Sequence, residues 1–262
     1  MRGILFDLDG VLYNSDKVIE GAAETVSWVQ GKGIPHLFVT NTTSRGRDAL
    51  VEKLQTFGIG ANRMHILTPC VAASEWMQAQ SHPLPAALFV APRALGEFEG
   101  LERLAPEVES GPSYVVIGDL GDAWDYRTLN RAFRLLQSDP ESELIALGMT
   151  PYWHADDGLR LDVAPFVAAL ECATGRKALI FGKPAEPFFR AAALHLGLLP
   201  GEIVMIGDGI ETDVAGAQNA GLKGVLVRTG KFRISDLHGP VKPDAVLDSI
   251  RDLPEWWEGL HA

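Results

Sequence analysis

Short apolar runs alternate with helix-like spacings of apolar residues in the first part of this chain. Residues 3–6 form an uninterrupted apolar run that is typical of a buried strand, and a second run follows at 36–40. Apolar residues at helical spacing lie between these runs and recur at 50, 54 and 57, where Gly58 predicts a helix end. A strand, a helix, a strand and a helix in this order predict a parallel sheet with helical crossovers.

The same alternation returns in the last third of the chain. Strands are expected at 177–181, 203–206 and 224–227, and helices at about 189–196 and 213–220. Together with the first segment, these elements predict one α/β core built on a doubly wound, Rossmann-like parallel sheet.

The middle of the chain departs from this rhythm. A stretch that contains Pro83, Pro85 and Pro92 begins at about residue 81 and is typical of a linker. Further strand-like runs and two amphipathic helices follow it. We therefore predict a core domain of residues 1–80 and 178–262, into which a smaller α/β cap domain of residues 81–177 is inserted.

Composition narrows the class of protein. The chain has 262 residues and a formal net charge of −11, without a run of Lys and Arg, so we expect no nucleic-acid partner. Two cysteines, Cys70 and Cys172, form neither a metal-binding spacing nor a disulfide framework, which favours a reducing compartment. No apolar run approaches the roughly 18 residues of a membrane span and no secretion signal is evident. We expect a cytoplasmic protein without a membrane partner.

Polar clusters follow four of the expected core strands. They are DLDG at 7–10, TNTTSR at 40–45, GKP at 182–184 and GDGIETD at 207–213. In an open parallel sheet, ligands bind beyond the carboxyl ends of the strands. Each cluster alone is also explained by a turn, a helix cap or a surface lysine. Four clusters at four strand ends are harder to obtain from turn chemistry, so we predict one shared site.

The expected site is strongly acidic. Two like charges about 4 Å apart repel by roughly 4 kcal/mol at an effective dielectric constant near 20, so several carboxylates need a counter-charge. All-oxygen ligands without His or Cys favour Mg²⁺ over Zn²⁺. The acidic residues are Asp7, Asp9, Asp208 and Asp213, and the cationic candidates are Lys183 and Arg45.

The same cluster suits a phosphoryl group. The hydroxyl of Thr40, the amide of Asn41 and the neighbouring backbone N–H groups can bind phosphate oxygens. A cation, a lysine and an anion site together indicate phosphoryl transfer, in which charge neutralisation dominates. One carboxylate can attack phosphorus, and a second one two residues later can protonate the leaving oxygen.

These four clusters, in this order, resemble the haloacid dehalogenase-like hydrolase superfamily over nearly the whole chain. The insertion between the second and third clusters is similar to class IIA, the NagD-like branch with a C2-type cap. The stretches LNRAFRLL, PFVAALECATGRKALIFGKP and MIGDGIETDVAGAQNAG resemble that branch in detail. Within it, they are most similar to the group that includes phospholysine phosphohistidine inorganic pyrophosphate phosphatase.

The resemblance implies a role for each motif residue. Asp7 would be the nucleophile, and Asp9 the general acid and base. Mg²⁺ would be held by Asp7, Asp208 and the backbone carbonyl of Asp9. The remaining roles concern the phosphoryl group and its surroundings: Thr40 and Asn41 would bind it, Lys183 would pair with the nucleophile, and Asp213 would hold Lys183 or a metal-bound water.

Two positions depart from the pattern of the resemblance. Thr42 stands where many relatives have a second Asn, and Asp162 stands where close relatives have small residues. In the cap, His154 lies beside Trp153 in a polar stretch. We therefore regard His154, Asp162 and Arg45 as candidate substrate contacts, although Asp162 is equally suited to capping a helix.

The expected function is a Mg²⁺-dependent phosphatase for a small phosphorylated metabolite. One alternative is hydrolysis of inorganic pyrophosphate or a phosphoamidate, and another is a non-catalytic phosphoacceptor module. Asp9 favours an enzyme, because storing phosphate needs no general acid. The sequence specifies neither the substrate nor the oligomeric state, and a homodimer is implied only by the resemblance.

Overall fold

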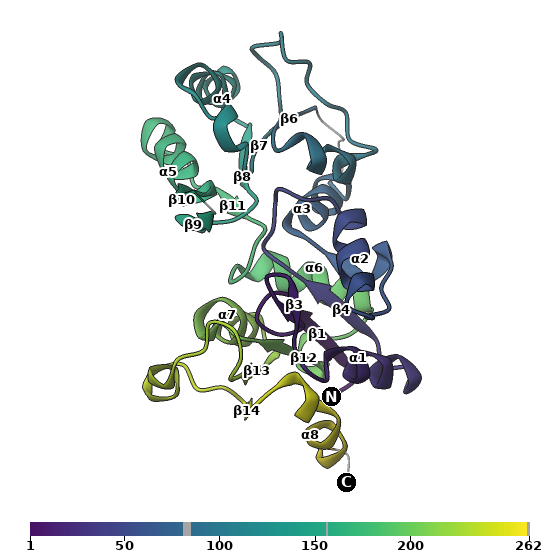
Figure 1. The fold of residues 1–262 in the computed structure, drawn as a ribbon. Helices are drawn as coiled ribbons and strands as arrows, with labels where there is room; N and C mark the ends of the chain where they lie inside the picture. The colour runs from purple at the N-terminus through teal and green to yellow at the C-terminus, as the bar shows by residue number, and fades with distance from the viewer. Residues whose placement is uncertain (81–84, 156, 261–262) are drawn as a thin grey trace. The chain divides into compact units, whose positions relative to one another are not determined.

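The computed structural model describes residues 1–80, 85–155 and 157–260, without the side chain of His154 (Figure 1). Its backbone forms two compact units. The first consists of Met1–Thr40, Arg47–Leu67 and Lys183–Ala262, and the second consists of Asn41–Gly46 and Thr68–Gly182. The limits 81 and 177 predicted for the inserted cap stay a prediction.

A six-stranded parallel sheet forms the centre of the first unit. Its first strand is buried along its whole length, as its apolar sequence predicts. It pairs in parallel with one strand on each side, so that Phe6 lies opposite Ile206 on one side and Phe38 on the other. In spatial order the strands are β14 (Ala245–Leu247), β13 (Lys223–Val227), β12 (Ile203–Gly207), β1 (Gly3–Asp7), β4 (His36–Val39) and β5 (Ile66–Leu67).

Helices flank this sheet. Val26, Leu50 and Trp257 lie in one buried cluster with Ile4 and Phe6, so the helices that carry them cover the same face. These helices are α1 (Ala22–Gly31), α2 (Arg47–Thr56) and α8 (Leu253–Gly259). The unit also contains α6 (Glu186–Leu196), which contacts β4, and α7 (Gly216–Asn219), which contacts β13 and follows a π-helical turn at Ile210–Ala215. A short hairpin, β2 (Tyr13–Asn14) and β3 (Lys17–Val18), follows β1.

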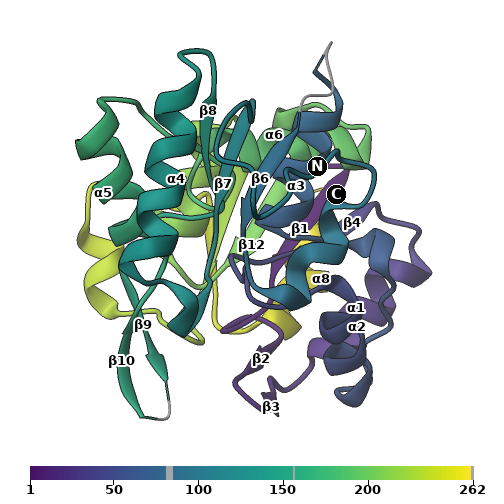
Figure 2. The same cartoon turned by 90° about the horizontal axis from the view of Figure 1, so that it is seen from above.

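The second unit has its own parallel sheet, seen in Figure 2 beside α4 and α5. Its strands are β11 (Leu179–Ile180), β8 (Glu143–Ala146), β7 (Tyr114–Ile117) and β6 (Ala86–Phe89), and its helices are α3 (Pro69–Gln78), α4 (Tyr126–Ser138) and α5 (Val163–Thr174). Trp124 stacks between Phe89 and Phe166, with ring centroids 5.8 and 4.6 Å apart. An antiparallel hairpin, β9 (Tyr152–Ala155) and β10 (Gly158–Leu161), precedes α5.

The predicted fold class is confirmed, with one correction. The apolar run 177–181 was expected to be a strand of the core sheet, but β11 pairs with β8 in the sheet of the second unit. An apolar run indicates a buried strand without specifying the sheet that it joins. Lys183 therefore enters the first unit from the loop before α6 rather than from the end of a core strand.

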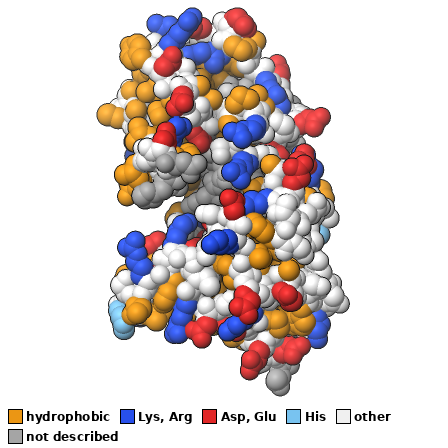
Figure 3. Space-filling model, viewed as in Figure 1, with side chains coloured by type: hydrophobic (Ala, Val, Ile, Leu, Met, Phe, Trp, Pro, Cys, Tyr) orange, Lys and Arg blue, Asp and Glu red, His pale blue; other side chains and the backbone are white. Residues whose placement is uncertain are grey.

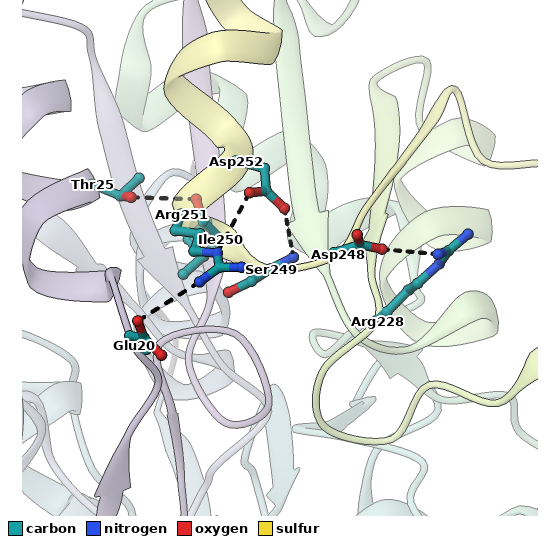
Figure 4. A network of polar contacts seen from close by, with 8 residues as sticks. All are labelled: Glu20, Thr25, Arg228, Asp248, Ser249, Ile250, Arg251 and Asp252. Atoms are coloured by element: carbon teal, nitrogen blue, oxygen red, sulfur yellow. Dashed lines mark hydrogen bonds and ion pairs between the residues drawn. The ribbon is translucent and has the colours of Figure 1, made fainter.

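Polar contacts join the C-terminal segment to the rest of the first unit (Figure 4). The hydroxyl of Thr25, on α1, donates to the carbonyl of Ile250 over 3.3 Å. Arg228, which follows β13, forms an ion pair of 2.8 Å with Asp248, which follows β14. Such exposed pairs contribute little stability, so the buried side chains of Ile250 and Trp257 provide most of the attachment.

Among the residues that the structure describes, no helix is long and apolar enough to cross a membrane. On the face drawn in Figure 3, Lys and Arg side chains are interspersed with Asp and Glu in both units.

Candidate active site

The carboxyl edge of the six-stranded sheet gathers buried polar side chains. Asp7 is the last residue of β1, and Asp208 directly follows β12, its parallel neighbour. Asp213 lies in the π-helical turn that comes next. Asp7, Asp208 and Asp213 are 6%, 1% and 1% exposed, so these three side chains are shielded from bulk water.

Lys183 joins two of these carboxylates. Its Nζ lies 2.8 Å from Asp7 Oδ1 and 2.6 Å from Asp213 Oδ1, and its side chain is 3% exposed. A buried ammonium is stable only when it is paired, since desolvation of a single charge costs several kcal/mol. The three side chains thus form a linked buried group in which one cation serves two anions.

Burial and pairing shift the pKa values of this group. Burial raises the pKa of Asp7 to about 7, although the nearby Lys183 ammonium works in the opposite direction. Burial also acts against the charge of Lys183, but Asp213 and Asp7 outweigh it and raise the pKa of the ammonium. Lys183 therefore remains a cation near neutral pH, and Asp7 lies close to the boundary between its two protonation states.

Each of the three carboxylates also accepts one backbone N–H. Leu8 N donates to Asp7 Oδ1 over 2.8 Å, Gly209 N to Asp213 Oδ2 over 2.9 Å, and Lys231 N to Asp208 Oδ2 over 2.7 Å. Such bonds favour the ionised form and fix the orientation of the carboxylate. At Asp7 and Asp208 they do not prevail, because burial still raises the pKa of both carboxyl groups.

The three carboxylates can hold a metal ion. One oxygen from each of Asp7, Asp208 and Asp213 lies within 4.8 Å of the others. Asp208 Oδ1 is buried and has no hydrogen-bond partner among the described residues. A buried oxygen without a partner is costly unless a ligand satisfies it. An all-carboxylate donor set of this kind fits a hard divalent cation.

Asp9 lies apart from this buried group. Its side chain is exposed, and its Oδ1 accepts the N–H of Ser15 over 3.1 Å. The backbone of Asp9 forms an isolated bridge to Tyr13, at the start of the β2–β3 hairpin. The structure thus gives Asp9 contact with solvent, which suits a group that exchanges protons, and its role stays a prediction.

The predicted phosphate-binding residues fall in both units. Thr40 follows β4 at the carboxyl edge of the first unit and donates its N–H to Leu67 O over 3.3 Å. Asn41 and Arg45 belong to the segment Asn41–Gly46 of the second unit; Asn41 is half-buried and Arg45 is exposed. The part that Asn41 and Arg45 take in the site therefore stays a prediction.

Of the candidate cap residues, Asp162 has a structural role. It is the N-cap of α5, and its Oδ1 accepts the N–H of Val163 over 2.8 Å. This contact explains an Asp at this position without a substrate, as the capping alternative predicted. His154 lies in β9, and its side chain is outside the part of the chain that the structure describes.

A fifth segment at the same sheet edge was not predicted from the sequence. Arg228–Lys231 follows β13, and the N–H of Lys231 contacts Asp208. The strand 224–227 was predicted, so its polar end could have been added to the four clusters by the same argument. The contact with Asp208 itself uses a backbone N–H, which the identity of the side chain does not reveal.

Comparison with known proteins assigns the chain to a family. Residues 4–102 match the model of haloacid dehalogenase-like hydrolases, and residues 180–253 match a second, HAD-hydrolase-like model. Phospholysine phosphohistidine inorganic pyrophosphate phosphatase of Danio rerio is 37% identical, across 95% of this chain and 92% of that protein. Haloacid dehalogenase-like hydrolase domain-containing protein 2 of Bos taurus is 40% identical, across 90% and 87%. The structure of p-nitrophenyl phosphatase from Archaeoglobus fulgidus is similar with a TM-score of 0.87 and 27% identity, across 97% and 98%.

The parallel sheet, the buried acidic edge and these relatives define an enzyme of phosphatase type. The chain belongs to the haloacid dehalogenase-like hydrolase family. The predicted place in class IIA, next to phospholysine phosphohistidine inorganic pyrophosphate phosphatase, is confirmed by the 37% identity to that relative.

Proposed function

We propose that the protein hydrolyses a small phosphorylated metabolite in a Mg²⁺-dependent reaction through an aspartyl-phosphate intermediate. The observation that carries this proposal is the buried group of Asp7, Lys183 and Asp213, with Asp208 beside it. It combines a carboxylate nucleophile, a cation for the transferred phosphoryl group and a donor set for a divalent cation.

Asp7 acts as the nucleophile. Its Oδ1 receives both Lys183 Nζ and Leu8 N–H, so Oδ2 is the oxygen that attacks phosphorus. The new Oδ2–P bond forms as the bond from phosphorus to the leaving oxygen breaks. Lys183 holds Asp7 in place and, as a fixed cation, stabilises the negative charge on the phosphoryl group.

Asp9 moves the protons. In the first step it donates a proton to the leaving oxygen as the alcohol departs. In the second step it takes a proton from water, which attacks phosphorus and breaks the Oδ2–P bond. Inorganic phosphate leaves, and Asp7 returns as a carboxylate. The exposure of Asp9 supports this role, since both steps need access to the leaving group and to water.

Asp7 and Asp208 would hold Mg²⁺ through their carboxylates, together with the backbone carbonyl of Asp9. Bound there, the cation would neutralise charge on the phosphoryl oxygens and favour the ionised form of the carboxylates. Asp213 also lies within the acidic group, but its ion pair with Lys183 favours a role in positioning the lysine. Thr40 and Asn41 would bind the phosphoryl oxygens.

Inorganic pyrophosphate and phosphoamidates form a second candidate substrate class. The specific observation in favour is the 37% identity to a relative whose name includes inorganic pyrophosphate, phospholysine and phosphohistidine. The same attack by Asp7 at phosphorus would apply, with phosphate or an amine as the leaving group. We further propose that the protein is cytoplasmic and acts without nucleic acid or membrane. A homodimer is a further expectation, which the molar mass in solution would test.

The test is phosphate release by the purified protein from a panel of phosphate monoesters, pyrophosphate and phosphoamidates. We expect release with Mg²⁺, loss of release in excess EDTA and recovery when Mg²⁺ is restored. Full activity in excess EDTA contradicts the metal requirement. A retained phosphoryl group without turnover on any compound would instead favour the non-catalytic phosphoacceptor module.

A further inference from the structure

The segment Thr229–Lys231 packs directly on Asp208. Asp208 Oδ2 accepts the N–H of Lys231 over 2.7 Å, while Asp208 Oδ1 is buried without a hydrogen-bond partner among the described residues. One oxygen of the carboxylate is thus fixed by backbone, and the other is left for a ligand. Burial does not explain the difference between the two oxygens, because both belong to the same buried side chain. The difference comes from the hydrogen bond that Oδ2 accepts.

Two glycines make this approach sterically feasible. Gly230 has φ of +62° and Gly10 has φ of +91°, a region that residues with a Cβ rarely adopt. A Cβ at either position would overlap Asp208 Oδ2, and a Cβ on Gly230 would also lie 2.5 Å from Gly10 Cα. The two backbones and the carboxylate can therefore meet only where both residues lack side chains.

Thr229 connects the segment to the loop after β1. Its hydroxyl donates to the carbonyl of Gly10 over 2.5 Å. On its other side, Arg228 N donates to Leu247 O over 3.0 Å, which joins the segment to β14. The segment is thus fixed at both ends to elements of the same unit.

We propose that Thr229, Gly230 and the backbone N–H of Lys231 are positioning residues for Asp208. They hold Oδ2 and so present Oδ1 to the divalent cation. This inference rests on the proposed function in one respect, the binding of Mg²⁺ at the acidic group. It assigns the task of setting metal affinity to a segment outside the four polar clusters, acting through a backbone N–H and the Thr229 hydroxyl. Groups that orient metal ligands typically change affinity by about 10–100-fold when they are removed.

Direct Mg²⁺ binding, measured by calorimetry without substrate, tests the proposal. In Gly230→Ala, the added methyl group displaces Asp208, and we expect the Kd for Mg²⁺ to rise about 10–100-fold. Gly197→Ala is the matched control. Gly197 has φ of +63°, almost the same as Gly230, but nothing lies within 4 Å of its missing Cβ. Both variants place an alanine at nearly the same φ, so the difference between them reports on the contact with Asp208.

Thr229 provides a milder pair of variants. Thr229→Val keeps the shape and removes the hydroxyl, and we expect weaker Mg²⁺ binding with the fold retained. Thr229→Ser keeps the hydroxyl and should restore wild-type affinity. A role in stability alone would lower the unfolding midpoint of metal-free Thr229→Val without changing its Kd for Mg²⁺.

The outcomes separate this inference from the proposed function. If Asp208→Ala abolishes Mg²⁺ binding while Gly230→Ala and Thr229→Val bind like the wild type, the positioning role is wrong and the metal site stands. If the wild-type protein binds no Mg²⁺ at all, both the metal site and the positioning role are wrong. If Gly230→Ala does not fold, the Thr229 pair decides.

Discussion

The two edges of the six-stranded sheet both bury titratable side chains, but they treat charge differently. At the carboxyl edge, Asp7 and Asp213 share the ammonium of Lys183. At the amino edge, His36 begins β4 and is 8% exposed, and its ring lies 4.9 Å from that of His65. The buried acids around Asp7 thus pair with an opposite charge, whereas buried His36 has a second base beside it.

The surroundings of His36 favour a neutral ring. His36 Nδ1 lies 2.9 Å from Ile34 O, so this nitrogen carries a proton and donates. Burial, together with the proximity of His65, lowers the pKa of His36. A cavity of about 660 Å³ lies at this edge and is lined by His36, His65 and His195 among others.

Burial acts on both edges in the same sense, since it disfavours charge on acids and bases alike. The difference lies in the counter-charge. Lys183 supplies a cation to Asp7 and Asp213. The described partners of the His36 ring nitrogens are instead the carbonyl of Ile34 and the amide of Gln30, whose Nε2 lies 3.5 Å from His36 Nε2. The two clusters therefore differ in the presence of a counter-charge, and not in the burial of their titratable groups.

The largest expected effect is the difference in kcat between two asparagine substitutions, Asp7→Asn at the carboxyl edge and His36→Asn at the amino edge. Asp7→Asn keeps the shape and removes the nucleophile, so kcat should fall by several orders of magnitude. His36→Asn changes a buried residue of the same sheet without touching the reacting group. Its kcat, measured on folded protein under the same conditions, should stay within a few fold of the wild type. Near-wild-type turnover by Asp7→Asn would contradict the covalent mechanism.

At the same carboxyl edge, the exposed Asp9 differs from the buried acids in its expected role, proton transfer. Removal of a general acid typically costs about 10²–10⁴-fold in rate. Asp9→Asn should show a loss of this size for an alkyl phosphate, whose leaving oxygen needs protonation. For an aryl phosphate with a good leaving group the loss should be smaller. Equal losses on the two esters, compared through kcat/KM, would reject the acid role and leave a positioning role.

The sequence predicted this edge better than any other part of the molecule. Asp7, Asp208 and Asp213 each follow a strand that was recognised from its apolar run, and parallel strands bring such ends together. The class of hydrolase follows from the same residues, because the identity of an aspartate or a lysine in the sequence already specifies the chemical group at the site. Alternation of strands and helices was likewise sufficient for the fold class.

Other features depend on contacts that sequence patterns do not encode. The run 177–181 was expected in the core, and its strand β11 joins β8 in the second unit. The short strands β5 and β14 and the hairpin β9–β10 were not predicted, since two to four residues give little periodicity. The contact of Lys231 with Asp208 uses a backbone N–H, which any residue except proline could supply.

Lys183 tests the energetic side of the comparison. Lys183→Met removes the shared cation and leaves Asp7 and Asp213 buried without it. Breaking a buried ion pair from one side typically costs about 3–5 kcal/mol of unfolding free energy. Lys223→Met is the matched control: its ion pair with Asp244 is 2.8 Å long but half-exposed, and such pairs contribute about 0–1 kcal/mol. Urea unfolding of both variants measures the difference, and equal losses would contradict the buried network.

The smallest expected effect is a pH dependence of stability at the amino edge. The pKa of His36 is lower in the folded protein than the ordinary value of 6.5, so the unfolded chain binds more protons just below that pH. The unfolding free energy should therefore fall as the pH drops from about 7 through 6.5 and toward the folded pKa, and this loss should level off below it. His36→Gln removes the group that titrates and should flatten this part of the curve, whatever its constant cost in packing. His238→Gln, at an exposed position, serves as the control and should keep the wild-type slope. Urea unfolding between pH 5 and 7.5 gives the slopes, and identical slopes for wild type and His36→Gln would mean that the amino edge tolerates a protonated histidine after all.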